Sequence, residues 1–132
     1  MTRVILLAGM MLWGGPVLAA GEGCANAMAQ SELTQCAHDD WQAQDAALNA
    51  AWAKAMAVMQ AVDADLPAGE RGAADRLRKG QRAWISFRDE ACAAEGYLMH
   101  GGSAEPMLVY GCMARLTEAR TGDLRLIAEA GY

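Results

Sequence analysis

Hydrophobic residues recur at three- and four-residue steps along most of this chain, the spacing that places them on one face of an α-helix. The first such segment covers residues 31–62. Ser31 is placed to cap this helix, and Glu32 lies in the first turn, where the helix dipole favours an acid. The mostly apolar stripe of the segment consists of Leu33, Cys36, Ala37, Gln44, Leu48, Ala51, Trp52, Ala55 and Met59.

The same pattern predicts two further helices. A proline and two glycines interrupt it within residues 63–72, and a second helix is predicted over residues 73–96. Residues 100–106 form the next break, and a third helix follows over residues 107–127, with an interruption expected at Gly122. No segment alternates with period two for long enough to indicate a strand. We therefore expect an all-α fold, an antiparallel three-helix arrangement with short connections.

Residues 1–20 have the layout of a secretory signal peptide. Arg3 supplies a positive charge, residues 4–13 form an apolar run, and a Gly-Gly-Pro break and small residues follow. The run is too short to span a bilayer, although a retained membrane anchor is the competing explanation. Cleavage is expected after Ala19 or Ala20.

Cys24 lies just after this segment, where a lipoprotein would carry its lipid. The charged Glu22, two residues upstream, is wrong for a lipidation signal. We therefore expect a periplasmic or secreted protein that is not a lipoprotein, with residues 21–132 forming a single helical domain.

The charge balance is acidic. The formal net charge is −5, and removal of Arg3 with the leader makes it −6. This balance disfavours nucleic acid and an anionic membrane surface as partners, and it favours a cationic one. No stable membrane insertion is expected.

Export also determines how the four cysteines are interpreted. A zinc site is the competing explanation, with His38 and His100 as additional ligands. Structural zinc sites usually place two ligands two to four residues apart, and none of the cysteine separations here, which are 12, 56 and 20, fits that spacing. Two disulfides are therefore expected. Cys92 and Cys112 lie equally far from the second break, and extended chain allows Cys24 to return to Cys36. These two pairings are favoured, and other pairings remain open.

An arginine on the inward stripe of the second helix needs a partner, because a buried unpaired charge costs much free energy. Arg88 shares its helix face with Gln81, and folding the first two helices back on each other brings Asp45 and Asn49 towards both. A structural polar network of Asp45, Asn49, Gln81 and Arg88 is therefore predicted. Arg88→Ala or Asp45→Ala is expected to lower the stability by a few kcal/mol.

The other charges of the second helix are expected to form surface pairs, which contribute little. These residues are Arg78, Lys79 and Arg82 with Asp75, Asp89 and Glu90.

Catalytic chemistry has no signature in this chain. The acid–base candidates are Glu95, Glu105, His38 and His100, and nothing in their spacing brings any two together. There is no nucleophile elbow and no glycine loop that would cradle phosphate. We predict a protein without enzymatic activity, metal or cofactor.

Four segments occur in the order of a known family: CANAMAQSELTQCA, DAALNAAW, LRKGQRAWISFRDEAC and GGSAEPMLVYGCMARLTEARTGDL. Over residues 24–126 the chain resembles the small secreted bacterial family named for the lysozyme inhibitor LprI. The QRAW block followed by the GGS segment is the most specific part of this likeness. The family pattern maps here onto Cys24, Cys36, Asp45, Leu48, Asn49, Gln81, Arg82, Trp84, Arg88, Cys92, Gly102, Ser103, Pro106 and Cys112.

The resemblance implies an exported, helical, disulfide-linked domain of the bacterial envelope. As an activity it implies inhibition of lysozyme by protein–protein contact. Two details depart from the family: Gly80 stands where alanine is usual, at a helix-propensity cost of about 1 kcal/mol, and the lipoprotein signal of the namesake is absent.

If lysozyme is the partner, the natural contact is the turn at residues 96–106, because connections present side chains to a cleft. His100, Gly102, Ser103 and Glu105 are the candidate contact residues, and Ser103 is also placed to cap the third helix. The acidic balance of the chain would attract a strongly cationic enzyme.

The alternative is a structural or interaction module of the periplasm. It would bind another envelope protein or a cell-wall component and would have no lysozyme activity. An exposed apolar patch around Met107, Val109 and Tyr110 would favour it. The sequence leaves the oligomeric state open.

Overall fold

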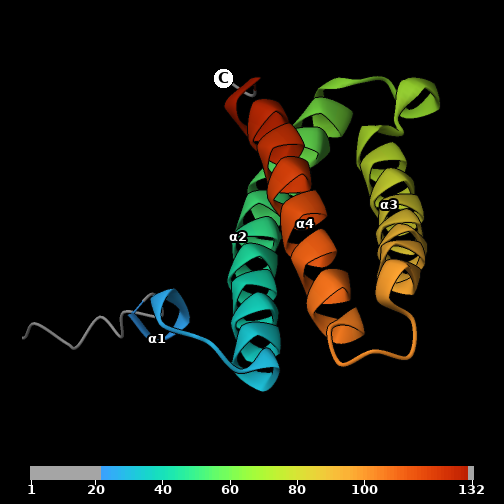
Figure 1. The fold of residues 1–132 in the computed structure, drawn as a ribbon. Coiled ribbons are helices and arrows are strands. Elements are labelled where there is room, and N and C mark those ends of the chain that lie inside the picture. The colour runs from blue at the N-terminus through green and yellow to red at the C-terminus, as the bar shows by residue number, and fades with distance from the viewer. Residues whose placement is uncertain (1–21, 131–132) are drawn as a thin grey trace, which may run out of the picture.

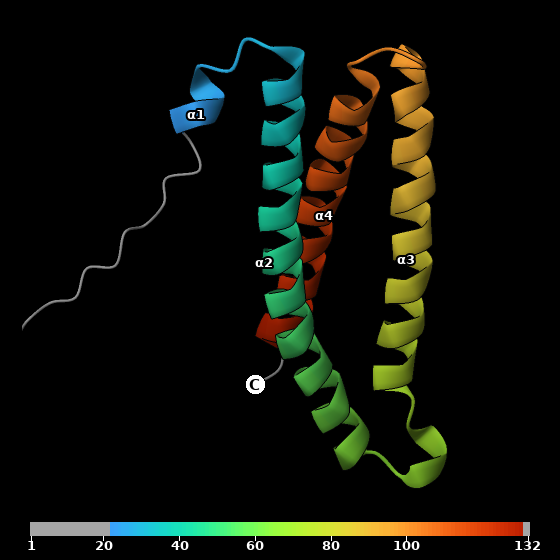
Figure 2. The same ribbon diagram turned by 90° about the horizontal axis from the view of Figure 1, so that it is seen from below.

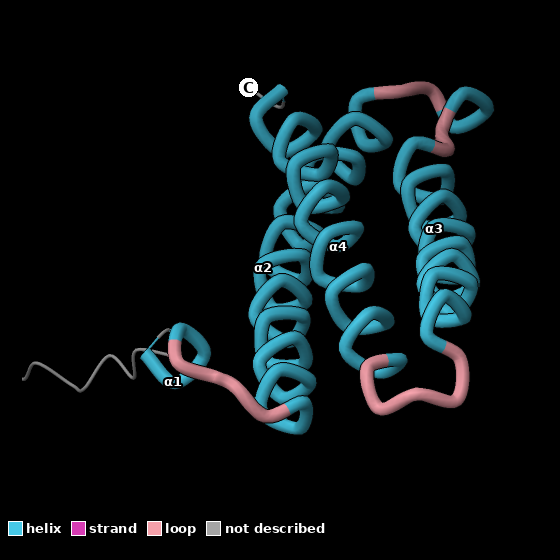
Figure 3. The backbone as a smooth tube through the Cα atoms, viewed as in Figure 1, coloured by secondary structure: helices cyan, strands magenta, loops and turns pink. Residues whose placement is uncertain are grey.

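The computed structural model describes residues 22–130, and the expected signal peptide at residues 1–20 lies outside this range. Within it the chain forms three long helices and no strand (Figures 1 and 3). The long helices are α2 (Gln30–Asp65), α3 (Ala73–Gly96) and α4 (Glu105–Ala130). The short elements are α1 (Glu22–Ala25) and the 3₁₀ turns η1 (Ala68–Glu70) and η2 (Tyr97–Met99). The all-α prediction is confirmed.

Successive long helices run in opposite directions, as the antiparallel prediction requires (Figure 2). α2 and α4 therefore run the same way, and they pack against each other more closely than either packs against α3. α3 rests mainly on α4. The last helix of the chain thus contacts both others and completes the fold.

Small side chains and leucines make up the buried core between the three helices. Alanines on α2 and α3 keep the distance between helix axes short, because that distance depends on the side chains at the contact. Buried members of the core are Leu48, Ala51, Ala55, Met56, Ala74, Leu77 and Leu124, with Trp52, Met59, Trp84 and Ile127 packed against them. Most of the predicted apolar stripe of α2 therefore does face the core.

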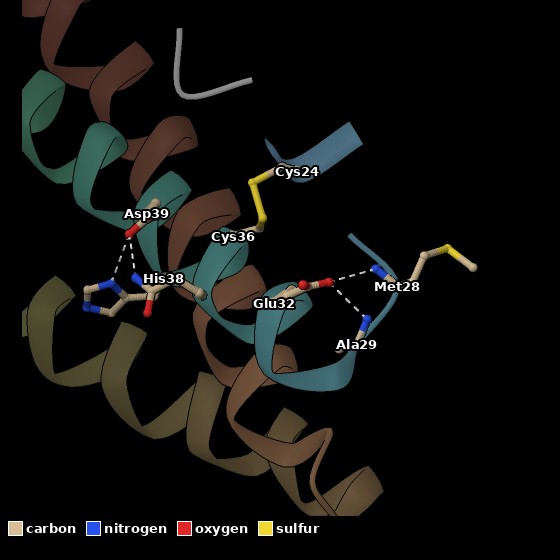
Figure 4. The surroundings of a disulfide bond; sticks show 8 residues. Cys24, Met28, Ala29, Glu32, Cys36, His38 and Asp39 are labelled. Carbon is tan, nitrogen blue, oxygen red and sulfur yellow. Dashed lines mark hydrogen bonds and ion pairs between the residues drawn. A yellow bond between two sulfur atoms is a disulfide. The ribbon is translucent and has the colours of Figure 1, made fainter. Parts of the chain in front are cut away.

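The helices differ from the sequence prediction at the ends of α2 and α4 and at Gly122. α2 begins at Gln30, so Ser31 lies inside the first turn and does not cap it; the Glu32 carboxylate instead accepts the N–H groups of Met28 and Ala29, each at 3.1 Å (Figure 4). α4 begins at Glu105 and continues through Gly122. One glycine costs a helix only about 1 kcal/mol, and burial of neighbouring α4 residues outweighs that.

The α2–α3 connection is held by an aspartate that the sequence places in the break. The Asp63 carboxylate accepts three backbone N–H groups at the start of α3, from Gly72 and Ala73 at 2.8 Å and from Ala74 at 3.0 Å. These bonds, that of Gly72 first, hold the pKa of Asp63 below its usual value of 3.8. A residue of α2 thus caps the next helix, where helix N–H groups lack partners.

Both predicted disulfides are confirmed. Cys92 of α3 is bonded to Cys112 of α4 with the Cα atoms 5.4 Å apart, and both residues are buried. Cys24 is bonded to Cys36 with the Cα atoms 5.7 Å apart, which ties α1 to the side of α2 (Figure 4). The first bond closes the α3–α4 hairpin and the second holds the start of the described chain.

None of the helices between residues 22 and 130 combines the length and the hydropathy that a bilayer crossing requires.

Candidate functional site

The turn between α3 and α4 depends on two glycines. Gly101 has φ +76°, in the left-handed region that favours glycine. A Cβ added to Gly102 would lie 3.0 Å from the backbone oxygen of Met99, which accepts the Gly102 N–H at 2.9 Å. The pair of glycines therefore permits a tight, hydrogen-bonded reversal directly after η2.

Glu105, the first residue of α4, braces this turn. Its Oε2 accepts the Gly101 N–H at 2.7 Å, and its Oε1 lies 3.2 Å from His100 Nδ1. The bond from Gly101, followed by that from His100, holds the pKa of Glu105 below its usual value of 4.5. The Tyr97 ring stacks on His100 with the ring centroids 4.5 Å apart.

This contact corrects one sequence-based expectation. His100 and Glu105 do meet, although their spacing alone does not suggest it, because the Gly-Gly reversal folds five residues of chain into one compact turn. The other acid–base candidates stay apart from this pair: His38 lies beside Asp39 at 3.4 Å, and Glu95 accepts a bond from Arg115 at 2.7 Å.

Three consecutive large apolar side chains project from the turn into solvent. Tyr97 is 67% exposed, Leu98 is 78% exposed and Met99 is 50% exposed. Together with Gly102, Ser103 and Ala104, they and His100 line an open hollow of about 500 Å³. Single exposed apolar residues are ordinary, whereas a contiguous group is typical of a contact surface.

These apolar residues lie within the predicted contact turn, residues 96–106, but they are not among the four contact residues named from the sequence. The sequence feature that could have identified them is the run Tyr-Leu-Met, which directly follows Gly96, the last buried residue of α3. By contrast Met107, Val109 and Tyr110 are half-buried, so the exposed apolar patch on α4 that would favour an interaction module is not present there. Three consecutive exposed apolar residues lie on η2 instead.

A second hollow, of about 520 Å³, opens between the first turns of α2 and α4. Its lining is rich in hydroxyl and amide groups: Gln30, Ser31, Thr34, Gln35, His38, Ser103, Pro106 and Tyr110. Tyr110 is held by stacking on Trp41, with the centroids 5.8 Å apart, and by an edge contact with His38 at 4.9 Å. Ser103 lines both hollows, so the two share one rim.

The four residues of the predicted polar network lie along facing sides of α2 and α3. Arg88 is buried, and its guanidinium lies 5.2 Å from the Trp84 ring centroid and 5.9 Å from that of Trp41. Its Nη1 is 3.7 Å from Asp45 Oδ1, and Asp45 also accepts a bond from Asn49 at 3.2 Å.

Two partners in this network differ from expectation. Asp89 was expected to form a surface pair with one of the exposed cations of α3. Instead its Oδ1 accepts hydrogen bonds from Arg88 Nε at 2.9 Å and from Arg88 Nη2 at 2.8 Å, because the buried guanidinium turns towards this adjacent residue. Gln81 accepts from Arg120 Nε of α4 at 3.0 Å and has no bond with Arg88. The predicted Asp75 pairs with Arg78 and Lys79 are present at 3.9 and 2.8 Å.

Between residues 22 and 130, no three histidine, cysteine, aspartate or glutamate side chains gather in a way that could hold a metal ion. The turn combines exposed apolar residues with a hydrogen-bonded backbone.

Comparisons with known proteins show the family of this chain. The chain is 44% identical over 110 residues to an uncharacterized protein, R02472, of Rhizobium meliloti (strain 1021), an alignment covering 81% of this chain and 79% of the relative. No solved structure matches the chain significantly. The family model described as lysozyme inhibitor LprI matches residues 22–124. The chain therefore belongs to the lysozyme inhibitor LprI family.

Proposed function

We propose that this protein is an exported inhibitor of lysozyme that acts by protein–protein contact through the α3–α4 turn. The observation that carries the proposal is the trio Tyr97, Leu98 and Met99, exposed side by side on a rigid turn in a chain of this family. Large side chains at the centre of an interface supply most of its binding energy. We name Tyr97, Leu98, Met99 and His100 the apolar turn.

The rigidity of the apolar turn supports this role. Glu105 holds the backbone at Gly101, and the Cys92–Cys112 disulfide joins the two helices that carry the turn. A preorganised loop loses little conformational entropy on binding, so more of the contact energy appears as affinity.

Charge supports the encounter. The chain carries a formal net charge of −5, and complementary charge raises the association rate with a cationic enzyme. His100 within the apolar turn, and Gly102, Ser103 and Glu105 directly after it, remain the proposed contact and positioning residues. The hydroxyl-rich hollow that shares Ser103 would extend the contact towards α2.

The two disulfides and the family indicate an extracytoplasmic location. We further propose that residues 1–20 are a cleaved signal peptide, that the mature protein is periplasmic or secreted without a lipid anchor, and that it has no enzymatic activity. N-terminal sequencing and the intact mass of the exported protein test the first two points. A lipid mass on Cys24 would contradict them.

The test of inhibition is a lysozyme turbidity assay on a susceptible cell wall with the purified, oxidised protein. Leu98→Ala should weaken inhibition about tenfold or more, as loss of an interface anchor does. Leu126→Ala is the matched control, since Leu126 is 69% exposed on α4, away from the turn. His100→Ala and Glu105→Gln should also weaken inhibition while the circular dichroism stays helical.

Equal inhibition by the Leu98→Ala and Leu126→Ala proteins would remove the apolar turn from the interface. No inhibition of several lysozyme types by the unaltered protein would favour the alternative, an interaction module that binds another envelope protein or a cell-wall component.

A further inference from the structure

A groove of about 310 Å³ runs between α2 and α3. Each helix contributes one stripe of residues three and four apart, so both stripes face the same space. The lining residues are Asp45, Leu48, Asn49 and Trp52 from α2, and Arg78, Gln81, Arg82, Ile85 and Arg88 from α3. Its volume lies at the lower end of the range for small-ligand sites.

The net charge of the groove lining is opposite in sign to that of the whole chain. Three of its lining residues are arginines and one is an aspartate, whereas the chain as a whole carries a formal net charge of −5. A cationic hollow in an acidic protein concentrates anions at one place on its surface.

Only part of this positive charge has a structural role. Arg88 is buried and neutralised by Asp89 and Asp45. Arg82 is exposed, and its guanidinium has no hydrogen bond or ion pair with any residue between 22 and 130. Arg78 is 3.9 Å from Asp75, which lies closer to Lys79 at 2.8 Å. Two like charges one helical turn apart repel each other, so an anion between Arg78 and Arg82 would relieve an unfavourable contact.

The groove is also polarised along its length. The ion pair of Asp45 with Arg88 marks one end of the groove. Because α2 and α3 are antiparallel (Figure 2), Trp52, which follows Asp45 along α2, lies towards the other end with Arg78 and Arg82, which precede Arg88 along α3. The first end offers guanidinium groups beside an apolar surface of Trp52 and Ile85. The second end offers the Asp45 carboxylate, which repels an acid and accepts N–H donors.

We propose that the α2–α3 groove binds a short acidic peptide segment, with its carboxylate on Arg78 and Arg82 and an apolar side chain against Trp52 and Ile85. Arginine suits this role because its planar fork of donors matches a carboxylate. Inorganic phosphate fits the arginines as well but cannot use the apolar floor. Peptide backbone N–H groups match the Asp45 end. This site is distinct from the apolar turn and does not rest on lysozyme inhibition.

Isothermal titration calorimetry of the oxidised protein tests the proposal. The probe is the N-acetylated peptide amide Leu-Glu-Glu-Leu, with the neutral Leu-Gln-Gln-Leu peptide and inorganic phosphate as comparisons. The acidic peptide should bind saturably and about tenfold or more tightly than either comparison, with an affinity that falls as salt is added.

Arg78→Gln combined with Arg82→Gln should weaken binding of the acidic peptide about tenfold or more. Arg78→Gln and Arg82→Gln are also measured singly, with Arg76→Gln as the control that removes one positive charge outside the groove. Arg76 is an exposed residue of the same helix that does not line the groove, so its replacement should change the affinity by less than about twofold. Circular dichroism verifies that all variants fold.

Three outcomes would overturn the proposal: no saturable binding of the acidic peptide, equal losses from the groove and control variants, or phosphate binding as tightly as the peptide. The last result would identify a simple anion site.

Discussion

Replacement of Arg88 tests how a buried cation is held in this fold. Its side chain is 9% exposed, whereas the side chains of Asp45 and Asp89 are 39% and 48% exposed. Removal of the guanidinium therefore leaves two carboxylates that water can reach, so the loss should be smaller than the roughly 3–5 kcal/mol typical of a fully buried broken pair.

The magnitude follows from the individual contacts. The paired bonds to the half-exposed Asp89 contribute about 1 kcal/mol after solvent screening, and the contacts with the Trp84 and Trp41 rings contribute about another 1 kcal/mol. Loss of the packed aliphatic stem adds to both. We expect Arg88→Ala to lower the free energy of unfolding by about 2–3 kcal/mol.

A series of variants separates these contributions. Arg88→Met keeps the packed stem, so it should cost about 1 kcal/mol less than Arg88→Ala. Asp45→Ala should cost less than about 1 kcal/mol, because its ion pair with Arg88 is long and exposed. This expected loss of stability is smaller than the few kcal/mol predicted from the sequence, since Asp89 makes shorter contacts with Arg88 than Asp45 does.

Urea unfolding of the oxidised proteins, followed by circular dichroism, measures the series, with Arg76→Ala as an exposed control. An Arg88→Ala loss below about 0.5 kcal/mol would refute the assignment of a structural role. An Asp45→Ala loss equal to that of Arg88→Ala would show that the Asp45 pair, and not Asp89 with the tryptophan rings, carries the stability.

Three further predictions concern the disulfides, the helix contact and the cap. Replacing Cys92 and Cys112 together by alanine should lower the free energy of unfolding by about 3 kcal/mol, because the unfolded chain is no longer restricted by the cross-link. Lost packing should add to this, since both residues are buried. Urea unfolding that shows no loss would contradict the prediction. Gly96→Ala should lower the free energy of unfolding by about 1–2 kcal/mol, because the new Cβ would lie 2.6 Å from Val109 Cγ2, and adding Val109→Ala should restore part of that loss. At Gly80 a Cβ meets nothing within 4 Å, so Gly80→Ala should instead stabilise the protein by up to about 1 kcal/mol. The folded-state pKa of Asp63 is depressed, so its contribution to stability is complete above the unfolded pKa and is lost as the pH falls through the folded pKa. Asp63→Asn should therefore flatten the stability profile below about pH 4 in acid titrations followed by circular dichroism, and an unchanged profile would contradict this role.

Local patterns were sufficient for the helices and for the cysteines. The three- and four-residue periodicity located all three long helices to within a few residues, because burial of one helix face imposes that period. Cys92 and Cys112 could be paired because equal distances from a turn put them at matching heights on antiparallel helices. The same register argument brought Asp45 towards Arg88, and in the structure Asp45 Oδ1 lies 3.7 Å from Arg88 Nη1.

Contacts between distant segments decided the rest. No local pattern distinguishes Asp63 from other acids near a helix end, and its role appears only when the start of α3 folds onto it. The exposure of Tyr97, Leu98 and Met99 could not be predicted from the sequence either. Apolar residues at a helix end are expected to be buried unless the neighbouring surface is known.

The amino-acid sequence by itself determined the helices and the family of this protein and favoured the disulfide pairing that the structure shows, because these depend on residue types and their spacing along the chain. Only the tertiary structure decided that α4 packs most closely on α2, that Arg88 turns to Asp89, and that an arginine-lined groove stays open between α2 and α3. These features depend on which faces are left uncovered after the helices pack, and that is a property of the whole assembly of helices.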